Sequence, residues 1–251
     1  MKIQYLWEWI WKGGYPELHA KGLKPERFYA DYLVTYLERD IRQIIQVKNL
    51  RDFDRFLRLC ATRTGQLISY STLASDIGIS PNTIKSWIGL LEASHVIYLL
   101  EPYYENLGKR IVKTPKIYFL DTGLASFLAG FQNPIDLMKS PLQGAFFETH
   151  VLGQMIRHLQ NRGKTPALYF YRDHAGCEID FVIPQGNALK LIEAKCASIL
   201  PTQIKNFQEI TQRVGKERII SQIVVSTLRD FREIGPSMYL DNSIELKSIV
   251  S

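Results

Sequence analysis

The sequence predicts an α/β protein in which a winged helix-turn-helix is followed by a layered α/β domain. Two observations support this fold class. After residue 50, an amphipathic helix, a short helix, another helix and two strand-like runs follow in order. After residue 126, a helix, three strand-like runs, a helix and a last strand follow. We therefore expect a helical segment over residues 1–50, a winged helix over 51–125 and an α/β domain over 126–251.

The composition is that of a folded globular protein. Hydrophobic residues make up 46% of the 251 residues and charged residues 22%, which excludes disordered, collagen-like and disulfide-scaffold classes. The net charge of +6 permits a polyanionic partner but does not require one. Three scattered cysteines indicate a reducing cytoplasm. No apolar run reaches the roughly 18 residues of a membrane span, so we expect no membrane partner.

The first 50 residues are predicted to be helical with a turn. Trp7, Trp9 and Trp11 lie close together, and Gly13-Gly14 and Pro16 follow them. A short segment cannot bury that many aromatic side chains by itself. We therefore expect this aromatic segment to dock on another surface, such as an ATPase domain or a second copy of the chain.

Capping residues mark the predicted helix-turn-helix. We expect Ser71 to cap the short helix and Gly78 to end it in a left-handed conformation. Ser80 then caps the second helix, which has proline at its first position. A strand over Val96–Leu100 and a return strand starting at Ile111 would form the wing.

This motif exposes polar groups at the start of the second helix and basic groups on the wing. The candidate nucleic-acid contacts are Asn82, Thr83, Lys85, Ser86, Lys109 and Arg110. Lys113 and Lys116 would extend the basic wing toward phosphates. Because Lys85 is the single basic residue in the first turns of the helix, a protein-docking role remains open beside DNA contact.

A predicted hairpin brings acidic residues together in the C-terminal region. Gly186-Asn187 separates two strand-like runs and reads as a two-residue turn. Counting outward from that turn, Asp180 lies opposite Glu193 and Glu178 lies opposite Lys195. These four side chains share one face. The opposite face is expected to be core and carries Ile179, Phe181, Ile183, Ile192 and Ala194.

A fourth acid is predicted to point toward the core. Glu148 shares a helical stripe with Leu152, Met155 and Leu159. A carboxylate on such a stripe is rare unless it is paired or bound to a metal. Opposed carboxylates on a sheet also repel, and a divalent cation or Lys195 would compensate. The alternative is a solvated patch with a Glu178–Lys195 pair.

The order Glu148, Asp180 and Glu193-Ala194-Lys195 resembles the PD-(D/E)XK nuclease core. The resemblance implies a restriction-endonuclease-like α/β/α domain with a Mg²⁺ or Mn²⁺ cofactor. It assigns Asp180 and Glu193 as metal ligands, Lys195 as the group that positions the attacking water, and Glu148 as a supporting acid in the metal shell.

A wider resemblance rests on four segments in fixed order. These segments are Trp11–Pro16, Tyr36–Ile41, Tyr118–Leu124 and Gly144–Glu148. Together they resemble the C-terminal part of a family of prokaryotic AAA-type ATPases, in which a P-loop domain precedes a winged helix and a nuclease-like domain of unknown function. Gly163-Lys164-Thr165 is not a P-loop, because His158 occupies the first glycine position and Pro166 follows. We expect no ATP hydrolysis by this chain alone.

The leading interpretation is a DNA-binding protein with a Mg²⁺-dependent site that hydrolyses phosphodiesters. The alternatives are a catalytically silent nuclease-like module that binds DNA or protein, and a protein-interaction module of an ATPase system. Motif completeness at residues 148, 180, 193 and 195 favours the first, whereas the modest net charge favours the others.

Overall fold

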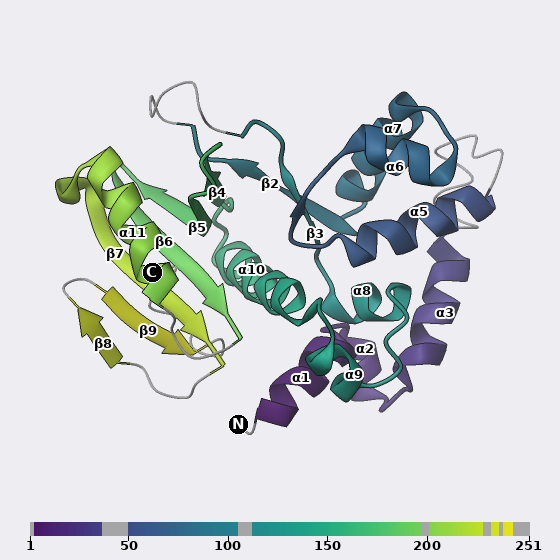
Figure 1. Cartoon of the computed structure of the whole chain (residues 1–251). Coiled ribbons are helices and arrows are strands. Elements are labelled where there is room, and N and C mark those ends of the chain that lie inside the picture. The colour runs from purple at the N-terminus through teal and green to yellow at the C-terminus, as the bar shows by residue number, and fades with distance from the viewer. Residues whose placement is uncertain are drawn as a thin grey trace. The chain divides into compact units, whose positions relative to one another are not determined.

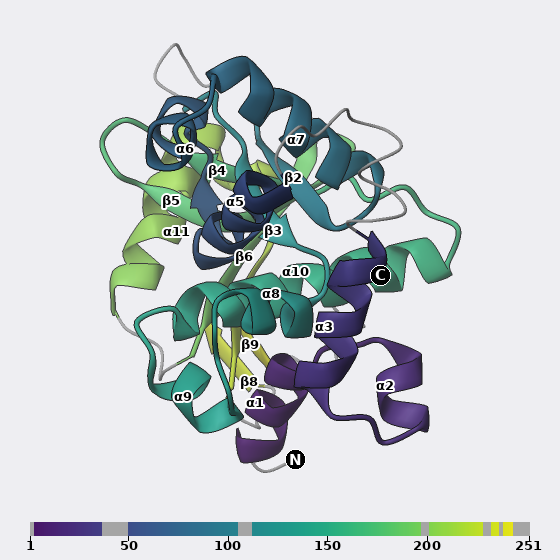
Figure 2. The ribbon, with the colours of Figure 1, turned by 90° about the vertical axis from the view of Figure 1, so that its right-hand side faces the viewer.

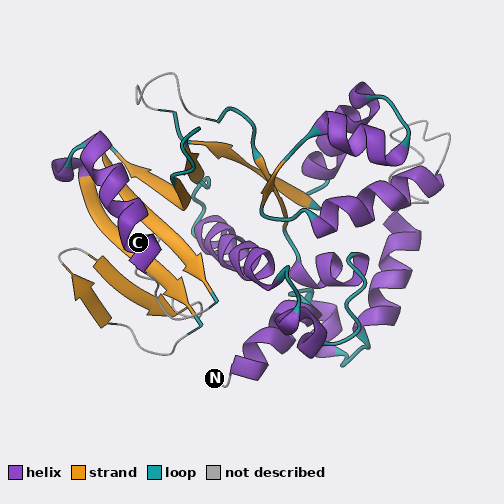
Figure 3. Cartoon of the chain, viewed as in Figure 1, coloured by secondary structure: helices purple, strands orange, loops and turns teal. Residues whose placement is uncertain are grey.

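The chain forms two compact units in its computed structural model, which describes residues 3–36, 50–104, 112–196, 201–227, 232–235 and 238–242 (Figure 1). Unit 1 comprises residues 1–98 and 117–146, and unit 2 comprises residues 99–116 and 147–251. Unit 1 is mostly helical, whereas unit 2 is built on a sheet (Figure 3). The predicted α/β class is confirmed at this level, and the three-region division stays a prediction. None of the described helices combines the length and apolar character needed to cross a membrane.

Unit 1 begins with helices that bury most of the aromatic N-terminal segment. Its helices are α1 (Ile3–Lys12), α2 (Pro16–Ala20), α3 (Pro25–Thr35), α5 (Leu50–Thr62), α6 (Tyr70–Ile77), α7 (Pro81–Ala93), α8 (Thr122–Leu128) and α9 (Pro134–Lys139). Helix α1 packs on α8 and α9. Trp7 is buried there, and Trp11 Nε1 donates a hydrogen bond to the Phe131 carbonyl at 3.0 Å. Trp9 stays 46% exposed. The segment therefore docks largely on its own chain.

Two of the recognised sequence segments meet in unit 1 at Asp121. The Asp121 carboxylate accepts hydrogen bonds from Gly14 N at 2.7 Å, Tyr29 Oη at 2.8 Å and Leu124 N at 2.8 Å. A Cβ atom at Gly123 would collide with the Tyr29 hydroxyl and the Lys12 backbone, so only glycine fits there. This network explains why glycine and aspartate occur at these places in the two segments.

The ends of α6 and α7 follow the predicted capping pattern with one correction. Gly78 adopts φ 87° and ends α6, and Ser80 Oγ accepts from Thr83 N at 3.1 Å at the start of α7. The prediction that Ser71 caps α6 is wrong. Ser69 caps it instead, because its extended backbone lets Oγ accept from Thr72 N at 3.3 Å, while Ser71 already lies inside the helix.

The strands that follow α7 are β2 (Ile97–Pro102) and β3 (Lys116–Phe119). The short strand β1 (Gln66–Leu67) lies beside β3, and Gly65 N donates to the Ile117 carbonyl at 2.7 Å. The predicted return strand at Ile111 and the preceding turn lie outside the described residues. In the described part of the chain, the strand that returns after β2 is β3, and all four of its residues are buried.

Unit 2 contains a mixed sheet and two long helices. Its elements are α10 (Gln143–Asn161, from residue 147 on), β4 (Tyr169–Arg172), β5 (Glu178–Gln185), β6 (Ala188–Lys195), α11 (Pro201–Val214), a short 3₁₀ helix (Lys216–Arg218), β7 (Ile219–Ser226), β8 (Arg232–Gly235) and β9 (Met238–Asn242). The strand order is β2-β4-β5-β6-β7-β9-β8. Pairs β4–β5, β5–β6 and β8–β9 are antiparallel, and pairs β2–β4, β6–β7 and β7–β9 are parallel. Strands β8 and β9 were not predicted.

Both faces of the β5–β6 hairpin are buried. Helix α11 packs on one face, and α10 lies on the opposite side of these strands in both views (Figures 1 and 2). The prediction that Ile179 lies on a core face away from the acids is incomplete. Ile179 packs with Val182 and Leu191 in the α11 cluster, because the β4–β5 register shifts and breaks the alternation in β5.

Candidate functional site

The predicted hairpin register is confirmed from the turn to the pair Phe181–Ile192. Phe181 pairs with Ile192, Val182 with Leu191, and the ladder continues to the turn, where Gly186 adopts φ 59°. At the far end of this ladder the two strands carry the predicted acids. The turn, rather than any contact at the site, therefore determines which acids meet.

Three of the predicted site residues converge at that end of the hairpin. Lys195 Nζ lies 3.0 Å from Glu193 Oε2 and 3.4 Å from Asp180 Oδ2. Ala194 N also donates to Asp180 Oδ2 at 2.8 Å, which holds the aspartate against the neighbouring strand. Glu193 is 2% exposed and Asp180 5%, so both carboxylates are removed from bulk water. The arrangement is a buried acid pair with an amine beside it.

Glu148 occupies the inward stripe of α10, as predicted. Leu152, Met155 and Leu159 on the same stripe are buried. The Glu148 carboxylate is 14% exposed, and its Oε1 lies 3.1 Å from Lys116 Nζ. The fourth predicted acid is therefore present beside the sheet and is engaged by a lysine.

Lys116 is a site residue that the sequence interpretation missed. Its prediction as a wing residue for phosphates is wrong, because Lys116 is 2% exposed. Its Nζ lies 2.6 Å from Glu178 Oε1 as well as 3.1 Å from Glu148 Oε1, and 5.4 Å above the centroid of the Phe170 ring. Arg172 Nη1 holds the other Glu178 oxygen at 3.2 Å. The signal for this position was a lysine at the head of the apolar run Lys116–Phe119.

Charge and burial shift the pKa values of the two central carboxyl groups in opposite directions. Burial, and then the negative charge of Asp180, raise the pKa of Glu193 well above its usual value. Burial alone would raise the pKa of Asp180, but Lys195, Lys116 and the Ala194 N–H outweigh it and lower that pKa. The same carboxylates raise the pKa of Lys195 against the effect of its burial. Asp180 therefore loses its proton more readily than Glu193.

Among the described residues, none donates a hydrogen bond to one buried oxygen of the site, Glu193 Oε1. A buried polar atom without a partner costs roughly 1–3 kcal/mol, so such atoms usually indicate a bound ion or water that completes the site. Two carboxylates are the number with which proteins commonly hold Mg²⁺, the remaining positions being water and phosphate oxygens. The residues therefore fit a divalent cation at Asp180 and Glu193.

The described residues contain no group of three or more His, Cys, Asp or Glu side chains placed to hold a metal ion. A complete protein cage of the kind seen in structural zinc sites is thus not formed by this part of the chain. Cys177 and Cys196 are free thiols, and burial raises the pKa of each to about 12.

Glu193→Gln should make the stability of the folded chain less dependent on pH. A carboxyl whose pKa is raised on folding stabilises the fold at low pH, and this contribution is lost as pH rises through the folded-state pKa. The wild type should lose up to about 1.4 kcal/mol per pH unit in that window, and the glutamine variant should not. Urea titrations with EDTA from pH 5 to 9 measure this. Parallel pH curves for the two proteins would show that Glu193 ionises normally.

The start of α7 presents the predicted polar groups to solvent. Asn82, Lys85 and Ser86 are exposed, and Thr83 is half-buried, with its hydroxyl 2.8 Å from Ser80 Oγ. Lys109 and Arg110 lie outside the described residues. On the neighbouring helices the cations are engaged: Arg58 pairs with Asp54, and Arg63 with Asp76. This surface is therefore polar rather than strongly basic.

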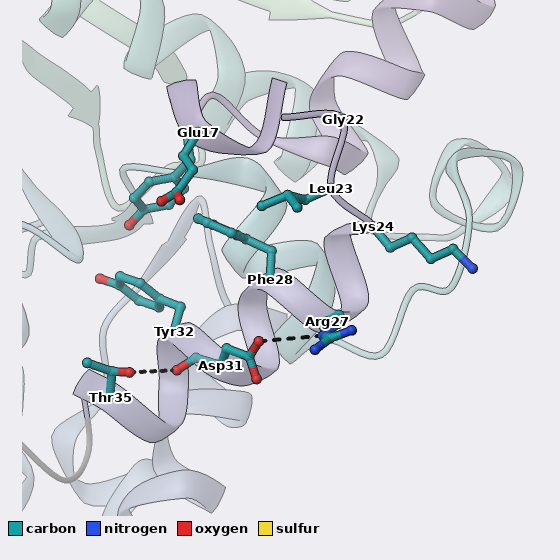
Figure 4. Close-up of a pocket in the computed structure, with 10 residues that line it drawn as sticks. Glu17, Gly22, Leu23, Lys24, Arg27, Phe28, Asp31, Tyr32 and Thr35 are labelled. Carbon is teal, nitrogen blue, oxygen red and sulfur yellow. Dashed lines mark hydrogen bonds and ion pairs between the residues drawn. The ribbon is translucent and has the colours of Figure 1, made fainter. Parts of the chain in front are cut away.

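A cavity of about 730 Å³ lies in unit 1, apart from all of the predicted site residues (Figure 4). It is lined by Tyr15, Glu17, Gly22, Leu23, Lys24, Arg27, Phe28, Asp31, Tyr32 and Thr35. Its charged groups are of both signs, and Arg27 pairs with Asp31 at 3.9 Å across one turn of α3. The lining thus shows no preference for a ligand of either charge. The sequence interpretation did not predict this cavity.

Comparisons with known proteins match both parts of the chain. A domain of unknown function (DUF8612) matches residues 3–134, and another domain of unknown function (DUF4143) matches residues 143–238. Two curated relatives are "Uncharacterized protein Mb2031c" of Mycobacterium bovis and "Uncharacterized protein Rv2008c" of Mycobacterium tuberculosis. Each is 31% identical over 179 residues, which cover 70% of this chain and 39% of the relative.

The chain thus matches well under half of the length of those relatives, and their names assign no activity. The first domain match, over residues 3–134, covers more than half of the 251 residues of this chain. The chain therefore belongs to the family of the domain of unknown function DUF8612, with a DUF4143 match in its C-terminal part.

Proposed function

We propose that the chain is a DNA-binding protein with a divalent-metal-dependent site that hydrolyses phosphodiesters on the β5–β6 hairpin. The observation that carries this proposal is the buried Glu193 Oε1, which accepts no hydrogen bond from the described residues although Lys195 contacts both Glu193 and Asp180. Mg²⁺ or Mn²⁺ bound by these two carboxylates would give that oxygen a partner. The order of α10, β4–β6, α11 and β7 is also the order of elements that the sequence pattern predicts for this region.

Each residue has a distinct part in this proposal. Asp180 and Glu193 hold the cation, which, when bound, polarises a phosphoryl oxygen and lowers the pKa of its water. Lys195 has a side chain 34% exposed, so its ammonium reaches solvent while contacting both acids. From there it can hold the attacking water or a phosphate oxygen in place.

Asp180→Asn and Lys195→Met should each lower Mg²⁺- or Mn²⁺-dependent cleavage of DNA by about 100-fold or more, because each removes a group that binds or orients at the reacting phosphate. Plasmid and labelled single-stranded DNA, with EDTA as the blank, measure this. Glu209→Gln is the matched control, since it changes a half-exposed acid of α11 that does not contact the site. Equal cleavage by all four proteins would mean that a contaminant cuts the DNA.

Lys85→Ala should weaken DNA binding about equally for different sequences. It should also lower the slope of log affinity against log salt by about 1, because one phosphate contact is lost. Fluorescence anisotropy from low to moderate salt measures the slope. Lys205→Ala on α11 is the control, since Lys205 is a similarly exposed lysine whose neighbour is Glu209. An unchanged slope for Lys85→Ala would remove α7 from the DNA interface.

A catalytically silent DNA- or protein-binding module is the second candidate. It is favoured by the ion pairs that already satisfy most carboxylate oxygens of the site, and by the engaged arginines near α7. Titration of the wild type with Mn²⁺ separates the two. A silent module gives no heat of binding yet retains affinity for DNA or a protein.

A further inference from the structure

Four carboxylates surround two lysines in unit 2. The acids are Glu148, Glu178, Asp180 and Glu193, and the lysines are Lys116 and Lys195. The contacts divide them evenly. Lys195 contacts Asp180 and Glu193, whereas Lys116 contacts Glu148 and Glu178. These contacts determine which of the four acids are available to bind a cation.

Lys116 is fixed much more firmly than Lys195. The Lys116 side chain is 3% exposed, with two carboxylate oxygens at 2.6 and 3.1 Å and the Phe170 ring at 5.4 Å. The surrounding acids keep it protonated, since Glu148, Asp180 and Glu178 raise its pKa against the opposing effect of burial. Lys195 is 34% exposed and can move its ammonium into water.

This difference decides which carboxylates can exchange a lysine for a metal ion. If Glu148 or Glu178 turned to a cation, Lys116 would lose a partner while remaining buried. Breaking a buried ion pair in this way is strongly destabilising, because it leaves a buried charge without compensation. Asp180 and Glu193 carry no such penalty, because Lys195 can be solvated, and Glu193 Oε1 has no donor among the residues that the structure describes.

Glu178 is held a second time. Arg172 Nη1 lies 3.2 Å from Glu178 Oε2, so both oxygens of this carboxylate contact a cation. Glu178 therefore joins Lys116 to Arg172 across the first strands of the sheet. It supports the site without offering a free oxygen to an ion.

From this geometry we infer that Lys116 is a positioning residue that reserves Glu148 and Glu178 as an ion-paired support, so that the cation is bound by Asp180 and Glu193 alone. The inference rests on the proposed metal-dependent function. It gives Glu148 a role different from the metal-shell role that the nuclease resemblance implies.

Calorimetric titration with Mn²⁺ alone tests whether Asp180 and Glu193 bind the cation while Glu148 and Glu178 do not. Asp180→Asn and Glu193→Gln should weaken Mn²⁺ binding by more than about tenfold, since each removes a direct ligand. Glu148→Gln and Glu178→Gln should stay within about threefold of the wild type, like the control Glu209→Gln, because these acids are paired with Lys116 and Arg172 and are not ligands in this proposal. Lys116 keeps one carboxylate in either variant, so both should fold. Weakening by Glu148→Gln as large as that by Asp180→Asn would overturn the inference.

The role of Lys116 is tested by the number of Mn²⁺ ions that bind per folded chain. Lys116→Met frees two carboxylates near the site, so the number of Mn²⁺ ions bound per folded chain should rise above the wild-type number. Lys116→Arg restores the cation and should restore the wild-type number. A merely structural lysine would leave the number unchanged in folded Lys116→Met, which would refute the positioning role. If Lys116→Met does not fold, the Glu148 and Glu178 variants decide alone.

The two proposals fail in different ways. Absence of Mn²⁺ binding by the wild type would contradict the metal-dependent function itself. Wild-type binding that depends on Glu148 or Glu178 as strongly as on Asp180 would leave that function standing and reject only the division of the acids.

Discussion

Replacing Lys116 with methionine is expected to lower the free energy of unfolding by about 3–5 kcal/mol. The substitution keeps the length of the side chain but removes the charge that Glu148 and Glu178 share. Both carboxylates are then largely shielded from water with less positive charge beside them, since the Glu148 side chain, for example, is only 14% exposed. Urea unfolding followed by circular dichroism measures the loss, provided that the slope of the transition is unchanged.

The control for this prediction is Lys113→Met, which removes an exposed lysine from the segment just before β3 and should change stability by less than about 0.5 kcal/mol. The double variant Lys116→Met/Glu148→Gln should recover part of the loss, because one of the two orphaned charges is gone. If Lys116→Met were as mild as Lys113→Met, the buried cluster would contribute no more than an ordinary surface pair.

Local sequence signals predicted the hairpin and the caps. Gly186-Asn187 determines the β5–β6 register, and that register alone places Asp180 near Glu193. Gly78 and Ser80 were recognised for the same reason, since each acts through backbone groups at most a few residues away. The three-residue turn between α6 and α7 was therefore predictable from sequence without knowledge of the tertiary fold.

Long-range pairing was not predictable in this way. Lys116 pairs with Glu148 on a helix and with Glu178 on a strand, and the apolar run that begins at Lys116 reveals neither of these distant partners. The face of Ile179 was misassigned because the register shift between β4 and β5 depends on a partner strand. Strands β8 and β9 were also missed, because they are short and pair beyond β7. Alternation within one strand cannot reveal either effect.

The second large effect is expected in unit 1, at Asp121. Asp121→Ala should lower the free energy of unfolding by about 2–3 kcal/mol, because it removes the cap of α8 and the acceptor of the Gly14 N–H, while the Tyr29 hydroxyl keeps the Lys12 carbonyl as an acceptor. Asp121 Oδ1 accepts from Leu124 N, which caps α8, and from the Tyr29 hydroxyl, while Oδ2 accepts from Gly14 N. Urea unfolding measures the loss.

Asp121→Asn separates the two contributions. The asparagine oxygen can still cap α8 and accept from Tyr29, but its amide nitrogen cannot accept from Gly14 N. We expect it to lose roughly 1 kcal/mol, the usual worth of one hydrogen bond. Asp136→Ala is the matched control, because Asp136 is an exposed acid in the first turn of α9. A loss of stability in Asp121→Ala no greater than in this control would mean that the contact between the Gly13-Gly14 turn and the start of α8 does not hold α1 in place. The position of α1 would then depend on the packing of the buried side chains of Trp7 and Ile10.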